Sequence, residues 1–181
     1  MPALPSVKSV QSLAKAFSGE NATSMIRREW KRLSGKPGGK LLFSKLISLV
    51  VPYTGTIGAR IEEIREGYAK VLLPDRRAVR NHLKSVHAIA MANLVELTAN
   101  LAVLFTAPDD TRMIPTRMTM EWLKKGRGPL VAECTLSATI SGSERKEYEN
   151  EVLIRDAQGD LVARGTVRSL IGPKRKADAA A

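Results

Sequence analysis

The sequence predicts an α+β domain in which an antiparallel sheet surrounds one long buried helix. Two observations predict this class. Residues 86–105 are apolar on nearly every side of a helix, which is typical of a helix covered by other structure all round. Six shorter runs, two before this segment and four after it, have the composition and turn boundaries of strands. We expect a sheet built from these strands to curl around the helix and bury it.

The composition limits the class of protein. The chain has 181 residues, enough for one domain with a helical extension, and its 26% charged residues indicate a soluble protein. Aromatic residues make up 4%, too few for stacking along single-stranded nucleic acid. The single cysteine, Cys134, excludes an internal disulfide, and no Cys or His spacing predicts a metal site. The first 20 residues contain no apolar signal-peptide core, and we predict a cytoplasmic protein.

Basic residues exceed acidic ones by 29 to 18, which gives a net charge of +11. This balance favours anionic partners such as nucleic acid, an acidic membrane or a phosphate-bearing small molecule. The excess gathers within residues 1–40, within residues 76–84 and in the tail at 174–176. Ordinary solvated charge explains the first and third clusters equally well. The second cluster adjoins the central helix and is the more interesting for function.

Helices are predicted before residue 55. The first has apolar residues at helical spacing, namely Val7, Val10, Ala14 and Phe17. A second helix is expected from Asn21, a plausible cap, to Leu33, followed by a loop at Ser34–Lys40. A short apolar helix at Leu41–Val51 is expected to stop at Pro52, and it is too short to cross a bilayer. We treat residues 1–55 as a helical prelude.

The strands follow from alternation and turn residues. Residues 59–74 predict two strands around Glu66–Gly67. After the central helix, residues 114–122 and 130–140 alternate with a period of two, with KKGRGP as the turn between them. The runs 146–155 and 161–171 flank DAQGD, a glycine-containing hairpin loop. We expect these last four strands to form a meander. The sheet domain is predicted over residues 56–172, with a disordered basic tail at 173–181.

The central helix carries polar residues at unexpected places. A membrane span of this length is disfavoured because four polar side chains, one of them ionisable, lie within it. Asn93, Glu96 and Asn100 lie within about 60° of one another, and His87 is on roughly the opposite face. A buried carboxylate costs several kcal/mol unless it is paired, hydrogen-bonded or protonated. Glu96 therefore either pairs with an arginine or a helix-capping group, or serves function. His87 taken alone is equally an ordinary helix-start residue.

Asn81, His87 and Glu96 together read N-x5-H-x8-[DE]. This arrangement resembles the signature of hotdog-fold acyl-CoA thioesterases of the phenylacetate-pathway type, whose pattern runs N…G…HGG…LAD. The segment VRNHLKSVHAIAMANLVELT is more similar still to an uncharacterised hotdog branch with a helical N-terminal prelude. The resemblance covers residues 45–171. It implies the hotdog fold, in which a curved antiparallel sheet wraps a long central helix.

The resemblance also implies roles for individual residues. Glu96 takes the place of the catalytic carboxylate, acting as base or nucleophile, and Asn81 and His87 match residues that line the thioester site. Ala88 stands where the family has a glycine whose backbone N–H polarises the thioester carbonyl. The family works as a homodimer, in some cases a tetramer, with the acid of one subunit facing the helix start of the other. The implied substrate is an acyl-CoA, with no cofactor beyond its coenzyme A moiety and no metal.

The chemistry fits this assignment, with two departures from the family pattern. A helix N-terminus offers free N–H groups and a positive dipole end to a developing oxyanion. The glycine pair of the family is replaced by Ala88–Ile89, and the acid is Glu rather than Asp. Two other functions therefore stay open. One is a non-catalytic hotdog module that binds acyl-CoA or a fatty-acyl ligand, and the other is a nucleic-acid or membrane-surface binder built on a hotdog dimer.

Overall fold

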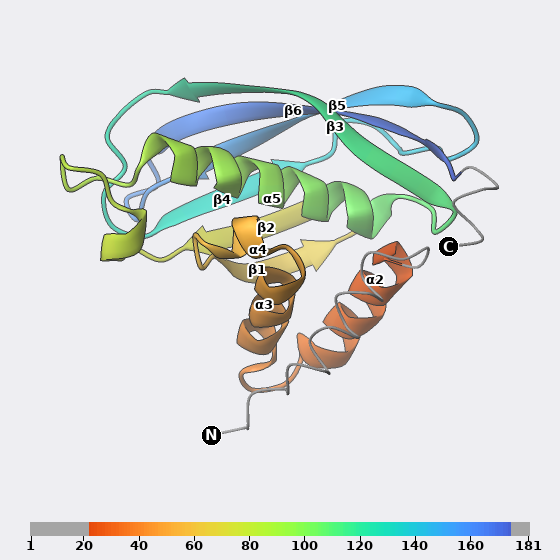
Figure 1. The fold of residues 1–181 in the computed structure, drawn as a ribbon, viewed down its shortest axis with the longest axis horizontal. Helices are drawn as coiled ribbons and strands as arrows, with labels where there is room; N and C mark the ends of the chain where they lie inside the picture. The colour runs from red at the N-terminus through yellow and green to blue at the C-terminus, as the bar shows by residue number, and fades with distance from the viewer. Residues whose placement is uncertain (1–21, 175–181) are drawn as a thin grey trace.

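The computed structural model describes residues 22–174 and confirms the predicted α+β class (Figure 1). Its long helix α5 (Ala88–Thr106) lies within a six-stranded antiparallel sheet of order β1-β2-β4-β5-β6-β3. In Figure 1 the sheet curves around α5, from β3 on one side to β1 on the other, and the N-terminal helices lie beyond β1. A curved antiparallel sheet around one central helix is the hotdog fold that the resemblance implied.

The predicted strands and their two hairpins are present. The strands are β1 (Arg60–Arg65), β2 (Tyr68–Leu73), β3 (Thr111–Trp122), β4 (Leu130–Thr135), β5 (Lys146–Arg155) and β6 (Leu161–Pro173). Gly67 turns the chain between β1 and β2 with φ 73°, and Gly159 turns it between β5 and β6 with φ 86°. Both angles lie in the left-handed region, where glycine avoids the steric penalty of a Cβ atom.

The predicted meander of four strands is wrong for β3. That strand pairs with β6 at the edge of the sheet, whereas β4 pairs with β2 and β5. Two strands thus separate β3 from β4, a gap of about 14 Å at the usual strand spacing. The connection at residues 123–129 can span this gap, because an extended residue covers about 3.3 Å. The KKGRGP segment is therefore a crossover along one end of the sheet rather than a tight turn.

The alternating run predicted to reach Ile140 as a strand ends earlier, at Thr135. Thr135 is the last residue of β4 to pair with β2, and its partner Tyr68 is the first residue of β2 after the Gly67 turn. The ladder stops because no backbone lies beside the run past that point. Ala138, predicted to point inward, is exposed.

The helical prelude is largely as predicted. Helix α2 covers Ala22–Leu33, and α3 covers Gly39–Val50 after a turn that follows α2. Pro52 was expected to end the helical structure, but it begins a further short helix, α4 (Pro52–Gly55). Proline is tolerated there because the N–H of a first helical residue has no intrahelical partner. The helix predicted around Val7–Phe17 and the Asn21 cap lie outside the described residues.

The prelude and the sheet share one hydrophobic core. Trp30 of α2 and Phe43 of α3 meet edge to face, with ring centroids 5.1 Å apart, and both belong to the same cluster of buried residues as the inner side of the sheet. Arg27 of α2 donates hydrogen bonds to the carbonyl oxygens of Phe105 (3.1 Å) and Ala107 (3.0 Å) at the end of α5. A cation at a helix C-terminus satisfies free carbonyls and the negative dipole end. Helix α2 is thereby tied to α5.

Helix α5 is the core element that positions the site. Within residues 22–174 it alone is long and apolar enough to cross a membrane, with a mean hydropathy of 1.7. It contacts all six strands, as a core helix does. Gly165 of β6 allows this close approach, because a Cβ atom there would lie 2.7 Å from the Val95 Cγ1 atom. The helix is therefore held tightly against the sheet.

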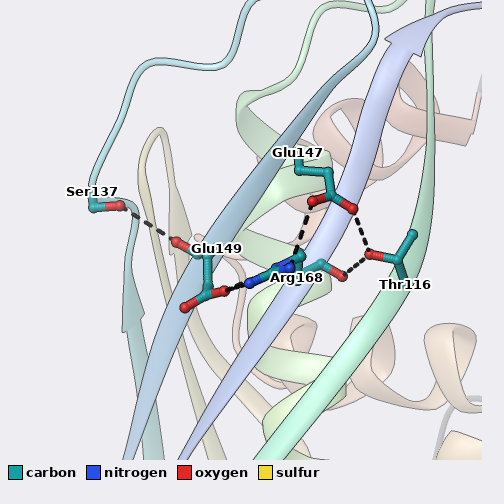
Figure 2. A network of polar contacts seen from close by, with 5 residues as sticks. All are labelled: Thr116, Ser137, Glu147, Glu149 and Arg168. Atoms are coloured by element: carbon teal, nitrogen blue, oxygen red, sulfur yellow. Dashed lines mark hydrogen bonds and ion pairs between the residues drawn. The ribbon is translucent and has the colours of Figure 1, made fainter.

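The outer face of the sheet is polar (Figure 2). Arg168 of β6 pairs with Glu149 of β5 at 2.8 Å and lies 3.7 Å from Glu147. The Thr116 hydroxyl of β3 donates to Glu147 at 3.4 Å, and Ser137 approaches the Glu149 carbonyl at 3.5 Å. Exposed ion pairs of this kind contribute little to stability. The network lies on the face away from α5 and joins the edge strand β3 to its neighbours.

Candidate active site

A short loop leads the chain into α5, and Asn81 shapes it. The Asn81 Oδ1 atom accepts hydrogen bonds from the N–H groups of Leu83 (2.9 Å) and Ser85 (3.2 Å), and from the Ser85 hydroxyl (3.1 Å). Lys84 within this loop has a left-handed backbone, with φ 57°. The Asn81 carbonyl oxygen is thus engaged in holding the turn that precedes α5. Its predicted role at the thioester site stays a prediction.

His87 is the N-cap of α5. Its Nδ1 atom accepts a hydrogen bond from the Ile89 N–H at 3.1 Å, and its own N–H donates to the Val79 carbonyl at 2.8 Å. A ring nitrogen that accepts carries no proton, so the neutral ring holds its proton on Nε2. The His87 side chain is exposed, which leaves this Nε2–H group available as a donor. His87 is therefore both a helix cap and a candidate ligand contact.

The first turn of α5 offers free backbone donors. The Ile89 N–H is used by His87, whereas the N–H groups of Ala88 and Ala90 have no hydrogen-bond acceptor among residues 22–174. Free N–H groups at a helix start, together with the positive dipole end, favour a negatively charged or polarised oxygen. The Ala88 N–H is thus free for the role that the family resemblance assigns to it.

A pocket of about 210 Å³ opens beside this helix start. It is lined by Tyr53, Thr56, Ile57, Ala78, Val79, Arg80, His87, Ile89, Ala90 and Asn93. Asn93 is 6% exposed, and its Nδ2 group donates to the Tyr53 carbonyl at 3.3 Å. The Asn93 Oδ1 atom has no donor among the described residues. A buried acceptor without a donor is costly, so this oxygen favours a ligand N–H or a bound water.

The pocket has contributors that sequence reasoning missed. Tyr53, Thr56 and Ile57 come from the end of the prelude, more than 30 residues before His87. Their types carry no catalytic signal, and only tertiary packing brings α4 over the start of α5. Asn93 did carry a signal, because an amide in an apolar helix needs an explanation.

The basic cluster before α5 is partly occupied by structure. Arg80 makes two hydrogen bonds to Asp75, at 2.6 and 2.7 Å, and this guanidinium holds the pKa of the Asp75 carboxyl below its ordinary value. Arg76 donates to the Thr56 carbonyl at 2.8 Å. Arg77 and Lys84 are exposed and have no ion pair within the described part of the chain. These two cations are the ones free to meet an anionic group.

Glu96 is a partly buried carboxylate with no use in the fold. It makes no hydrogen bond or ion pair with residues 22–174, so the expected arginine or capping partner is absent from that part of the chain. By helix geometry it shares one open stripe of α5 with Ile89, Asn93 and Asn100. The Asn100 Oδ1 atom is likewise buried without a donor. Polar groups without partners therefore follow this stripe.

The structure does not bring His87 and Glu96 together within one chain. They are nine residues apart, which is roughly 13 Å along a helix axis, and Glu96 does not line the pocket at the helix start. Any site that uses both residues on one substrate needs a second copy of the chain.

Comparison with known proteins gives the family. The model of a family described as a domain of unknown function, DUF4442, matches residues 39–171. The chain belongs to the DUF4442 family. The matched segment of this DUF4442 chain starts at α3 and ends within β6, so it takes in part of the prelude. The domain boundary proposed at residue 56 stays a prediction. No curated protein matches the chain.

Solved structures share the fold of this DUF4442 chain. The crystal structure of genomics APC5556 is 28% identical and has a TM-score of 0.71, covering 84% of this chain and 99% of that one. PA5026 from Pseudomonas aeruginosa, described as a probable thioesterase, is 22% identical with a TM-score of 0.66 and covers 77% and 97%. The thioesterase SAV0944 from Staphylococcus aureus is 14% identical with a TM-score of 0.60 and covers 67% and 99%. These likenesses confirm a hotdog fold of the thioesterase type.

Proposed function

We propose that this protein hydrolyses acyl thioesters, with acyl-CoA as the substrate class, at a site formed between two copies of the chain. The observation that carries the proposal is Glu96, a partly buried carboxylate without a partner among the described residues, on the open stripe of the central helix. A charge kept in that place without a structural use is what a catalytic group requires. The described thioesterases among the similar folds support the same chemistry.

The proposed reaction needs one base and one set of oxyanion donors. The Ala88 N–H binds the thioester carbonyl oxygen, where the helix dipole stabilises the charge that develops. Glu96 of the second copy takes a proton from water, and the water oxygen bonds to the carbonyl carbon. The carbon–sulfur bond then breaks, and the thiolate takes the proton that Glu96 holds. In this scheme His87 contacts the substrate through Nε2–H, and Asn81 holds the loop that presents it.

The edge strand β3 supports assembly of two copies. Its outer backbone edge has no partner strand within the described chain, since it pairs only with β6. Ile114, Met118 and Trp122 on this strand are 41–47% exposed. An open edge with exposed apolar side chains favours pairing with another strand. We therefore propose a homodimer, or a tetramer of such dimers, joined through β3.

The test is thiol release from a panel of acyl-CoAs, from acetyl to palmitoyl, followed with a thiol reagent. We expect wild-type turnover and its loss in Glu96→Gln, which keeps the shape and removes the base. Glu151→Gln, an exposed glutamate on the outer face of β5, is the matched control and should keep full activity. Unchanged turnover in Glu96→Gln would sink the catalytic assignment.

One observation favours a second function, a non-catalytic module that binds acyl-CoA. Ala88 and Ile89 stand where the resembling thioesterases have glycines, and the Ile89 side chain is 54% exposed and lines the pocket. Side chains at that point narrow the approach to the backbone donors. A binding module would turn over none of the acyl-CoAs, yet acyl-CoA would raise the melting temperature.

A further inference from the structure

Five large apolar side chains are exposed on the N-terminal side of the molecule, all between residues 41 and 53. Their exposed fractions are Leu41 45%, Leu42 40%, Leu49 43%, Val51 45% and Tyr53 68%. We call these side chains, together with Lys45, the α3–α4 face. Exposed apolar residues scattered singly are ordinary, but a contiguous group marks an interaction surface.

The arrangement on α3 makes this face a stripe. At 100° per residue, Leu41, Leu42 and Leu49 lie within about 100° of one another, and Lys45 lies between them. The opposite side of α3 buries Phe43 and Ile47 in the core. The inner side therefore accounts for the place of α3 in the fold. The outer leucines have no such use.

The surrounding charge is of one sign. From Trp30 to Ile61 the chain has no acidic residue. Its basic residues there are all exposed, namely Lys31, Arg32, Lys36, Lys40, Lys45 and Arg60. The α3–α4 face is thus an apolar stripe within a basic segment. Such a combination fits a surface that is anionic outside and apolar just beneath.

We propose that the α3–α4 face docks on the surface of an anionic lipid bilayer. Leucines at this face enter the boundary between headgroups and acyl chains, as the apolar side of an interfacial helix does. Lysines and arginines around it meet anionic headgroups, each contributing a favourable interaction near the surface. Lys45 extends its charged end past the leucines to reach the same headgroups. Tyr53 has the amphipathic ring that concentrates at membrane interfaces.

Two other occupants fit the face less well. A symmetric contact with a second copy would bring the same basic segment of each chain together, and like charges would repel. The open edge of β3 already offers a second copy a different place. A nucleic acid would satisfy the basic residues, but its phosphate backbone gives Leu41, Leu42 and Leu49 nothing apolar to contact.

The docking face adjoins the pocket. Tyr53 belongs to the face and also lines the pocket, next to Thr56 and Ile57. Protein docked through this face therefore holds the pocket mouth near the lipid, where long-chain acyl thioesters partition. Docking itself does not rest on the proposed hydrolysis, because it depends on other side chains and is measured without turnover.

The test is co-sedimentation of the full chain with phosphatidylcholine vesicles, with and without phosphatidylserine. We expect sedimentation only with the phosphatidylserine vesicles, weakened by added salt. The double variants Leu41→Ser/Leu49→Ser and Lys36→Glu/Lys45→Glu should each bind about tenfold more weakly or worse. Leu123→Ser, an equally exposed leucine (48%) on another element, is the matched control and should bind as wild type. Melting temperatures identify any variant that fails to fold.

Three results would overturn the proposal. The first is no sedimentation of the wild-type chain with either vesicle, and the second is undiminished binding by Leu41→Ser/Leu49→Ser. The third is a loss of oligomer mass in that variant, measured by light scattering, without a loss of vesicle binding, which would assign the face to a second copy. Tighter binding of duplex DNA than of anionic vesicles, lost in Lys36→Glu/Lys45→Glu, would likewise assign it to nucleic acid. Thiol release by the Glu96→Gln variant bears on none of these results.

Discussion

The His87 Nδ1 atom accepts a hydrogen bond from the Ile89 N–H at 3.1 Å, and this contact sets the start of the central helix. It uses one of the free N–H groups of the first turn and leaves those of Ala88 and Ala90 without acceptors among the described residues. It also leaves Nε2 as the protonated nitrogen of the neutral ring. One hydrogen bond thus decides which donors the helix start offers to a ligand.

Replacing His87 separates its capping role from its ligand role. His87→Ala should lower the free energy of unfolding by about 1 kcal/mol, because a helix cap is lost. His87→Asn should recover most of that stability, since asparagine is a preferred cap, while still lacking the Nε2–H donor. Urea unfolding measures the first effect and acyl-CoA turnover the second. Full activity in His87→Asn would show that His87 acts only as a cap.

Arg27 should matter more for stability than its basic neighbours. Arg27→Leu removes a charged donor from the Phe105 and Ala107 carbonyls and should cost about 1.5–3 kcal/mol. Arg28→Leu is the matched control, because that side chain is 68% exposed, and it should stay within about 0.5 kcal/mol of wild type. Denaturant unfolding checks both. Equal losses in the two variants would contradict the role assigned to Arg27.

Asp75 should make stability depend on pH in the acid range. Arg80 holds the pKa of the Asp75 carboxyl below its ordinary value of 3.8, so the folded state binds this proton less readily than the unfolded state. The stabilisation is therefore complete above pH 3.8 and is lost as the pH falls through the lowered pKa. Asp75→Asn should be less stable than wild type at pH 6, and the difference should shrink towards pH 3. A difference that is constant with pH would contradict this.

Cys134 should be unreactive in the folded protein. The residue is fully buried, and burial raises the pKa of its thiol to about 12. Because the thiolate is the reactive form, a thiol reagent at pH 8 should modify the chain only as it unfolds. The chain has one cysteine, so the signal reports a single site. Rapid stoichiometric labelling without urea would contradict the burial, and slow labelling also means little background in the thiol-release assay.

Local patterns identified most of the secondary structure. The apolar run around Leu94 and the alternation along residues 146–155 each depend on one element having a buried side, and that requirement is written into the spacing of residues. The site was marked in the same way, because Glu96 and His87 are polar residues in a run that is otherwise apolar. Strand partners were not marked, and neither was the end of β4 at Thr135.

The sequence by itself determined that one long helix is buried in a curved antiparallel sheet, and that this helix carries a carboxylate in need of an explanation. Only the tertiary structure decided that β3 lies at the sheet edge, that α4 covers the pocket with Tyr53, and that Glu96 has no partner within residues 22–174. The reason is physical. Periodicity reports which side of an element is buried, whereas partners come from contacts between residues far apart in the chain, and these leave no periodic trace in it.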